Sequence, residues 1–238
     1  MQKRILMVGN TDGLPGVPVD IHDYYSFFTS PAGGSWYDDE IDILLDPPQH
    51  ELLETLADIE EADYDYVIVF FSGHGEETID GTVLYINGKG EAVLLHNLTE
   101  LSQRQLLIVH CCRVHQRIPV DISIDSTVLS LSHNAIRQAY EEMIEFSAPQ
   151  QVILLSCDDG EATWGTANGG FYSRYLLDAI EIALSDSRMR FVSVGRAHYK
   201  AVSLMRQECL QLGQNPTMLQ SPCSIHHRLP LAVNARHF

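Results

Sequence analysis

The chain has 238 residues, of which 45 % are hydrophobic, so we expect one globular domain over residues 1–238. No apolar stretch reaches the roughly 20 residues of a membrane span, so we expect no membrane partner. Residues 1–100 carry 20 acidic and 3 basic side chains, which accounts for the whole formal net charge of −17; this excess repels nucleic acid and favours basic partners, although a solvated acidic face explains it equally well. Five cysteines without paired spacing, and an N-terminal apolar run too short for a signal peptide, indicate a cytoplasmic protein with free thiols.

Continuous apolar runs alternate with amphipathic segments along the chain. The runs predict buried strands over residues 4–9, 66–71, 106–111 and 151–157. Apolar residues at helical spacing, such as Leu52, Leu53, Leu56 and Ile59, predict helices over residues 50–61, 134–146, 171–184 and 195–212. This alternation indicates an α/β sandwich with a mostly parallel central sheet. Residues 9–20 and 113–132 have no such pattern and are predicted as long loops, which are often functional.

A histidine and a pair of cysteines follow two of the predicted strands. The turn Ser-Gly-His-Gly, with His74 between two glycines, leaves strand 66–71, and the segment His-Cys-Cys-Arg-Val leaves strand 106–111. In open α/β sheets the carboxyl ends of neighbouring strands converge at one edge. If these strands are adjacent, His74 and one cysteine of the Cys111–Cys112 pair form a dyad.

Such a dyad could cleave peptide bonds. A thiolate is a strong nucleophile, and an imidazole can take the thiol proton and later give it to the leaving amine. Gly73 and Gly75 would let the chain turn sharply, and the N–H groups of Gly75 and the cysteine could hold the oxyanion.

Simpler interpretations of these residues remain open. A single histidine at a strand end is commonly a hydrogen-bonded structural residue, and cysteines that end an apolar strand commonly pack in the core. Neither cysteine belongs to a Cys-x-x-Cys pair, and His110 and His115 lack the spacing of metal ligands. We therefore predict no metal and no cofactor.

Several segments, in the right order, resemble the caspase and metacaspase superfamily. VIVFFSGHGEE is similar to its histidine motif and LLIVHCCRV to its cysteine motif, while KRILMVGN, GVPVDIHDYYSFF, VILLSCDDGEATWG, GGFYSRYLLDAI and GQNP are similar to its other segments. The resemblance implies a three-layer caspase-like sandwich and a cysteine endopeptidase acting on protein substrates. It also implies that His74 is the general acid and base and Cys112 the nucleophile, with Cys111 as a packing residue. Cys157, in LLSCDDG, is an alternative nucleophile by its similarity to a related branch of peptidases.

The resemblance also bears on specificity. Asp20 matches an aspartate that lines the pocket for an Arg or Lys before the scissile bond in metacaspases, but His110 stands where those enzymes have a second aspartate. With Asp158 or Asp159 from the next strand end, Asp20 would favour a basic residue through an ion pair. Asp20 could instead cap the first helix or interact with its dipole.

The resemblance extends to regulation, with fewer residues to support it. Segment 113–132 stands where relatives carry an activation segment, and Arg113 and Arg117 are candidate self-cleavage sites unless the segment is an ordinary loop. Asp80, Asp121 and Asp125 have no calcium-loop spacing. By analogy, the chain could be a prokaryotic effector of a stress or anti-phage response that an activating protein or ligand switches on.

Two other classes of function remain as alternatives. One is an inactive caspase-fold interaction module whose acidic first half docks a basic partner. The other is a flavodoxin-like nucleotide-binding module, suggested by MVGNTDG after the first strand, although the chain lacks a Gly-x-Gly-x-x-Gly phosphate loop.

Overall fold

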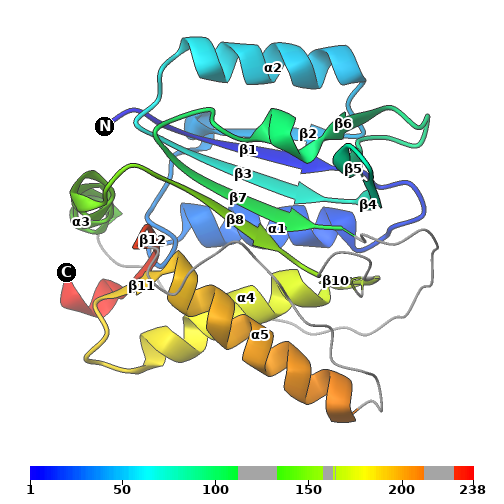
Figure 1. Cartoon of the computed structure of the whole chain (residues 1–238). Coiled ribbons are helices and arrows are strands. Elements are labelled where there is room, and N and C mark those ends of the chain that lie inside the picture. The colour runs from blue at the N-terminus through cyan, green and yellow to red at the C-terminus, as the bar shows by residue number, and fades with distance from the viewer. Residues whose placement is uncertain (112–132, 158–162, 164, 212–227) are drawn as a thin grey trace.

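A parallel sheet of five strands forms the centre of the computed structural model, which describes residues 1–111, 133–157, 163, 165–211 and 228–238 (Figure 1). The strand order is β2-β1-β3-β7-β8. The strands are β1 (Lys3–Gly9), β2 (Ile41–Leu45), β3 (Tyr66–Ser72), β7 (Arg104–His110) and β8 (Gln150–Leu155). All four neighbouring pairs are parallel. This architecture confirms the predicted α/β sandwich.

Helices cover both faces of this sheet (Figure 1). They are α1 (Val17–Thr29), α2 (Gln49–Glu61), α3 (His133–Phe146), α4 (Phe171–Ser185) and α5 (Val194–Gln211), with short 3-10 turns η1 (Asp38–Glu40), η2 (Leu95–Leu98) and η3 (Ala235–His237). Helix α2 lies over one face, and α1, α4 and α5 lie over the other. None of the helices within the described ranges combines the length and the apolar character that crossing a membrane requires.

Successive residues of β1 show how the sheet separates two hydrophobic cores. Ile5 and Met7 pack with side chains of α1, α3, α4 and α5, whereas Leu6 and Val8 pack with side chains of α2 and β5. Because neighbouring side chains of a strand point to opposite faces, a strand covered on both sides is apolar throughout. This explains why the four predicted strands were continuous apolar runs, and each lies within two residues of its predicted bounds.

Two local predictions were wrong. Helix α1 begins at Val17 with a proline in its first turn, so the predicted loop over residues 9–20 is helical in its last four residues. On α2, Leu52, Leu56 and Ile59 are buried as expected, but Leu53 is 43 % exposed because it lies on the solvent side of the helix.

Three small antiparallel sheets were not predicted. The largest joins β4 (His74–Thr78), β5 (Gly81–Tyr85) and β6 (Ala92–Leu94). The others pair β9 (Gly165–Thr166) with β10 (Gly169–Gly170), and β11 (Phe191–Ser193) with β12 (Pro230–Val233). The first of these sheets matters for the site because β4 begins at His74, two residues after the end of β3.

A charged network closes the amino-terminal end of the sheet. The Lys3 side chain is fully buried, with its Nζ 3.0 Å from Glu40 and 3.8 Å from the centre of the Trp36 ring. Arg137 of α3 binds both carboxylate oxygens of Glu40, each at 2.6 Å. Burial alone would raise the pKa of Glu40, but the bonds from Arg137 and Tyr37 and the charge of Lys3 lower that pKa to about 2. Glu40 therefore remains charged and ties η1, β1 and α3 together.

Candidate active site

The carboxyl ends of β1, β3 and β7 lie level with one another. The register pairs Gly9 with Ser72, and Ser72 with His110. The next residues keep this alignment, because Asn10 donates its N–H to the Ser72 carbonyl and Gly73 donates its N–H to the His110 carbonyl, both at 3.0 Å. Ser72 and His110 are thus paired on the adjacent strands β3 and β7. His74 comes two residues after Ser72, and Cys112 comes two residues after His110.

His74 is half-buried at the start of β4, and its ring is oriented by a backbone carbonyl. Its Nε2 lies 2.6 Å from the carbonyl oxygen of Asp12. Because a carbonyl can only accept a hydrogen bond, Nε2 must carry the ring proton in the neutral imidazole. Nδ1 is then the nitrogen that can accept a proton from a thiol.

The loop that carries Asp12 is held from both sides. The Asn10 side chain donates to the carbonyl of Tyr85 in β5 at 2.8 Å and accepts the N–H of Asp12 at 3.1 Å. Thr11 donates its N–H and its hydroxyl to the carboxylate of Asp46, at 2.8 and 2.5 Å. A Cβ atom on Gly73 would lie 2.9 Å from the Cβ of Asn10, so the close approach of this loop requires glycine there.

The Asp12 carbonyl was not among the predicted site residues. A backbone carbonyl has no residue identity that a sequence motif could reveal. The available signal was its position, three residues after the end of the first strand, in a loop rich in glycine and proline.

Cys112 lies outside the described residues, but the two alternative nucleophiles are described. Cys111 is 1 % exposed and Cys157 fully buried. The Cys111 carbonyl accepts hydrogen bonds from Ser156 Oγ at 3.1 Å and from Cys157 Sγ at 3.3 Å. Burial keeps both thiols away from a substrate and so disfavours both alternatives. The Cys157 thiol is in addition a donor to the Cys111 carbonyl.

Asp20 lies in the first turn of α1, close to the ends of β3 and β7. Its carboxylate is 4 % exposed, and both oxygens accept hydrogen bonds: Oδ1 from the N–H of Gly170 at 2.8 Å, Oδ2 from the hydroxyl of Ser72 at 2.7 Å. Gly16, and not Asp20, is the N-cap of the helix. A carboxylate in the first turn still interacts favourably with the helix dipole.

His110, the last residue of β7, packs against the same glycine. A Cβ atom built on Gly170 would overlap the His110 ring. The ring is 5 % exposed, and its Nδ1 has no hydrogen-bond partner within the described part of the chain. Burial lowers the pKa of His110, opposed by the negative charge of Asp20, so the ring is neutral near pH 7. We call Asp20, Ser72, His110 and Gly170 the Asp20 cluster.

The other predicted site residues lie partly within and partly outside the described ranges. Gly75 is buried and pairs with Leu84 in the register of β4 and β5. Asp158 and Asp159 lie outside the described residues, as do Arg113, Arg117, Asp121 and Asp125. Asp80 is exposed. Within the described ranges, no three His, Cys, Asp or Glu side chains gather as a metal site would require.

Comparisons with known proteins identify the family and the fold of the chain. A family model described as "Caspase domain" matches residues 2–227. Caspase-1 from Spodoptera frugiperda has a similar structure, with a TM-score of 0.56 and 12 % sequence identity over 98 % of this chain and 84 % of that one. Protein GSU0716 from Geobacter sulfurreducens has a TM-score of 0.52 and 13 % identity over 86 % of this chain and 89 % of that one. No curated protein matches the sequence.

Proposed function

The chain belongs to the caspase-domain family, and on that basis we propose that it is a cysteine endopeptidase that cleaves protein substrates with His74 and Cys112. The observation that carries this proposal is the alignment at the carboxyl edge of the sheet. Ser72 and His110 are paired, and the candidate base and the candidate nucleophile each follow by two residues. The carbonyl of Asp12 supports the same assignment because it fixes the histidine tautomer that a general base needs.

The chemistry of this site requires no group beyond these side chains and backbone amides. Nδ1 of His74 takes the proton from Cys112, and the resulting thiolate attacks the carbonyl carbon of the scissile bond. The N–H groups of Gly75 and Cys112 stabilise the oxyanion that forms. The imidazolium then protonates the leaving amine, and water hydrolyses the acyl-enzyme with His74 again acting as the base.

We propose that the residue before the scissile bond is Arg or Lys. The support is the environment of Asp20, whose buried carboxylate is bonded, among the described residues, to an amide and a hydroxyl and to no charged group. No salt bridge reaches it from any residue in the described ranges, and the neutral His110 supplies no positive charge. A basic substrate side chain would complete an ion pair there, whereas an acidic one would be repelled. Asp158 or Asp159 could add to this preference.

We also propose that an activating protein or ligand prepares the site. Both carboxylate oxygens of Asp20 already hold partners, so an incoming basic side chain must compete with Gly170 and Ser72. The resemblance to the family extends this proposal to a role in a prokaryotic stress or anti-phage response.

Peptide cleavage tests the proposed function. A proteome-derived peptide library is incubated with the wild type, Cys112→Ala and His74→Ala, and new termini are identified by mass spectrometry. We expect cleavage after Arg or Lys by the wild type only. Cleavage that survives Cys112→Ala but is lost in Cys111→Ala or Cys157→Ala would reassign the nucleophile. Cleavage mainly after Asp would overturn the basic preference.

A further inference from the structure

The outer edge of β2 leaves one side of the central sheet without a partner strand among the described residues. Asp46 donates its N–H to Gly9 of β1, and Ile41 donates its N–H to Asp38. Because successive N–H groups of a strand point in opposite directions, the N–H groups of Ile43 and Leu45 point away from β1. No strand within the described ranges pairs with these groups, so they can pair with an added strand.

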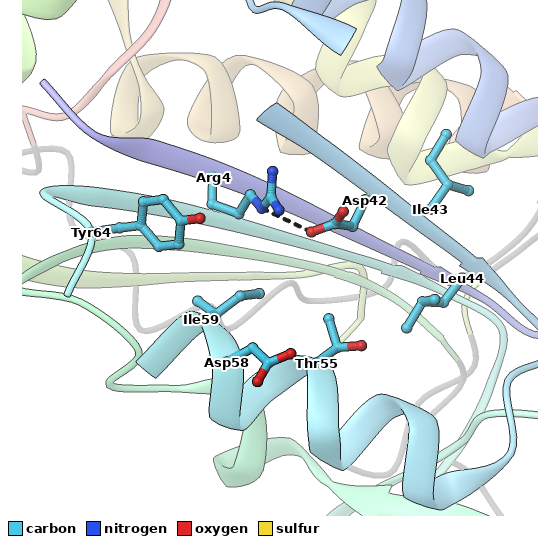
Figure 2. Close-up of a pocket in the computed structure, with 8 residues that line it drawn as sticks. All are labelled: Arg4, Asp42, Ile43, Leu44, Thr55, Asp58, Ile59 and Tyr64. Atoms are coloured by element: carbon cyan, nitrogen blue, oxygen red, sulfur yellow. Dashed lines mark ion pairs between the residues drawn. The ribbon is translucent and has the colours of Figure 1, made fainter. Parts of the chain in front are cut away.

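The two faces of this edge differ in chemistry. On the α1 side, the side chains of Ile43 and Leu45 are 42 % and 48 % exposed. On the α2 side lies a shallow pocket of about 270 Å³ (Figure 2). Its lining residues are Arg4, Asp42, Ile43, Leu44, Thr55, Asp58, Ile59 and Tyr64. An added strand would therefore meet apolar side chains on one face and a polar pocket on the other.

The charge around this pocket is negative. Residues 38–65, which comprise η1, β2, α2 and the segments that follow β2 and α2, contain twelve Asp or Glu and neither Lys nor Arg. The charge of Arg4 is already matched, because its Nε lies 2.8 Å from Asp42. Asp58 and Glu54 remain exposed, and both lie on α2 one turn apart. The unmatched charge at this edge is thus carboxylate.

We propose that this edge binds an extended segment of a partner protein in which basic and apolar residues alternate. The backbone of that segment pairs with Ile43 and Leu45 as a sixth strand. Its apolar side chains pack on the exposed faces of Ile43 and Leu45, and its Lys or Arg side chains reach Asp58 and Glu54. A second copy of this chain is a poor occupant because it would bring the same twelve acidic residues to the edge.

This docking edge is separate from the candidate active site. Strand β1 lies between β2 and β3, the strand that leads to His74. Binding at β2 therefore requires neither His74 nor Cys112. A partner held there could be a substrate docked away from the cleaved bond or an activator.

Fluorescence anisotropy with a labelled Lys-Val-Lys-Val-Lys-Val-Lys peptide tests the proposal on the Cys112→Ala chain, which leaves the probe uncut. We expect saturable binding that Glu54→Lys with Asp58→Lys weakens about tenfold or more. Glu142→Lys with Glu145→Lys, the same charge change at exposed positions of α3, should leave binding within about twofold of its original strength, as expected of distant sites. Circular dichroism checks that each variant is folded.

N-methylated probes test the strand pairing without altering the protein. One peptide is methylated on its valines and the other on its inner lysines. In a paired strand, alternate N–H groups face β2, so one peptide should lose binding and the other retain it. Equal effects of the two modifications would overturn strand pairing.

Two further outcomes would place the occupant elsewhere. Binding that is lost in Asp20→Asn but unaffected by Glu54→Lys with Asp58→Lys would assign the probe to the Asp20 cluster and overturn the docking edge. Concentration-dependent dimers in sedimentation velocity, abolished by Ile43→Lys, would show that a second copy occupies the edge. Neither result depends on peptidase activity, so the proposed function is judged separately.

Discussion

A few side chains near the strand ends serve mainly to hold other groups in place. Asn10 is the clearest case because it bonds to β5 and to the N–H of Asp12, whose carbonyl in turn fixes His74. A displacement of about 1 Å at a catalytic group can cost on the order of a hundredfold in rate. Positioning residues of this kind therefore have measurable effects without contacting substrate.

We predict that Asn10→Ala lowers kcat about 10- to 100-fold and leaves KM nearly unchanged, because His74 loses its fixed orientation. Steady-state kinetics on a peptide with Arg before the scissile bond measures both constants. Asn97→Ala is the matched control, since the Asn97 side chain lies in η2, where it accepts the N–H of Leu94, and takes no part in holding the loop that carries Asp12. A kcat in Asn10→Ala equal to that of the control would refute the positioning role.

Position 170 requires glycine because a larger residue would meet its neighbours, not because of its backbone conformation. Its φ of −79° is open to any residue, but an added Cβ atom would overlap the His110 ring. We predict that Gly170→Ala destabilises the chain by about 1–3 kcal/mol, as overpacking does, and that adding His110→Ala recovers part of the loss. Urea denaturation gives the free energies of unfolding.

Gly165→Ala supplies the control for this pair, because a Cβ atom there meets nothing within 4 Å. Its stability should be close to that of the wild type. Additive losses in the Gly170→Ala and His110→Ala double variant would contradict a direct contact between these residues.

Strands and helices were predicted to different degrees, for physical reasons. Strands β1, β3, β7 and β8 are buried on both faces, and their apolar runs were evident in the sequence. Strand β2 was missed because it is short, lies at the edge and is half-exposed, so its residues resemble a loop. Strand β4 was missed because it forms by pairing with β5, and the sequence around His74 contains no local signal of that pairing.

The candidate site, like the fold, was predicted only in part. His74 was predicted from its position after a strand end, and Asp20 and His110 were predicted from the resemblance to metacaspases. The bonds of Asp20 to Gly170 and Ser72 were not foreseen, because they join residues 150 and 52 positions apart in the sequence. Contacts of this range depend on the packing of α1 against the sheet and against β10.

The network around Glu40 links three elements and makes stability depend on pH. In the folded chain the pKa of Glu40 is about 2, below the roughly 4.3 of an unfolded chain, so its contribution is complete above about pH 4.3 and is lost as pH falls toward 2. We predict that Glu40→Gln costs about 3 kcal/mol near pH 7, because the buried Lys3 loses the carboxylate 3.0 Å away and is left with the more distant one of Glu141, at 3.6 Å. The stability difference from the wild type should shrink between pH 4.3 and 2.

Urea denaturation of both proteins across this pH range measures the difference. Asp186→Asn is a matched control, since the pKa of Asp186 is also lowered to about 2 by Arg188 but the pair lies at the surface, with the Arg188 side chain 88 % exposed. Exposed pairs contribute little, so its effect should be small at every pH. A constant difference between Glu40→Gln and the wild type would contradict the linkage.

At the scale of the whole molecule, the fold brings distant segments to one edge of the sheet. The loop after β1 carries Asp12, the end of β3 leads to His74, and the end of β7 leads to Cys112. The acidic first half of the chain also supplies the docking edge on β2, at the far side of β1. We propose that both places bind basic groups: the Asp20 cluster binds the residue before the cleaved bond, and the docking edge binds a partner strand.

The most direct test of the central claim compares cysteine labelling by iodoacetamide in the wild type and in His74→Ala. Mass spectrometry measures the rate at which each cysteine is labelled. If His74 and Cys112 act together, Cys112 should be the fastest cysteine to label in the wild type, and its labelling rate should fall about tenfold or more in His74→Ala. The buried Cys111 and Cys157 should label slowly in both proteins. Equal labelling of Cys112 in the two proteins would contradict a functional pair at this strand edge.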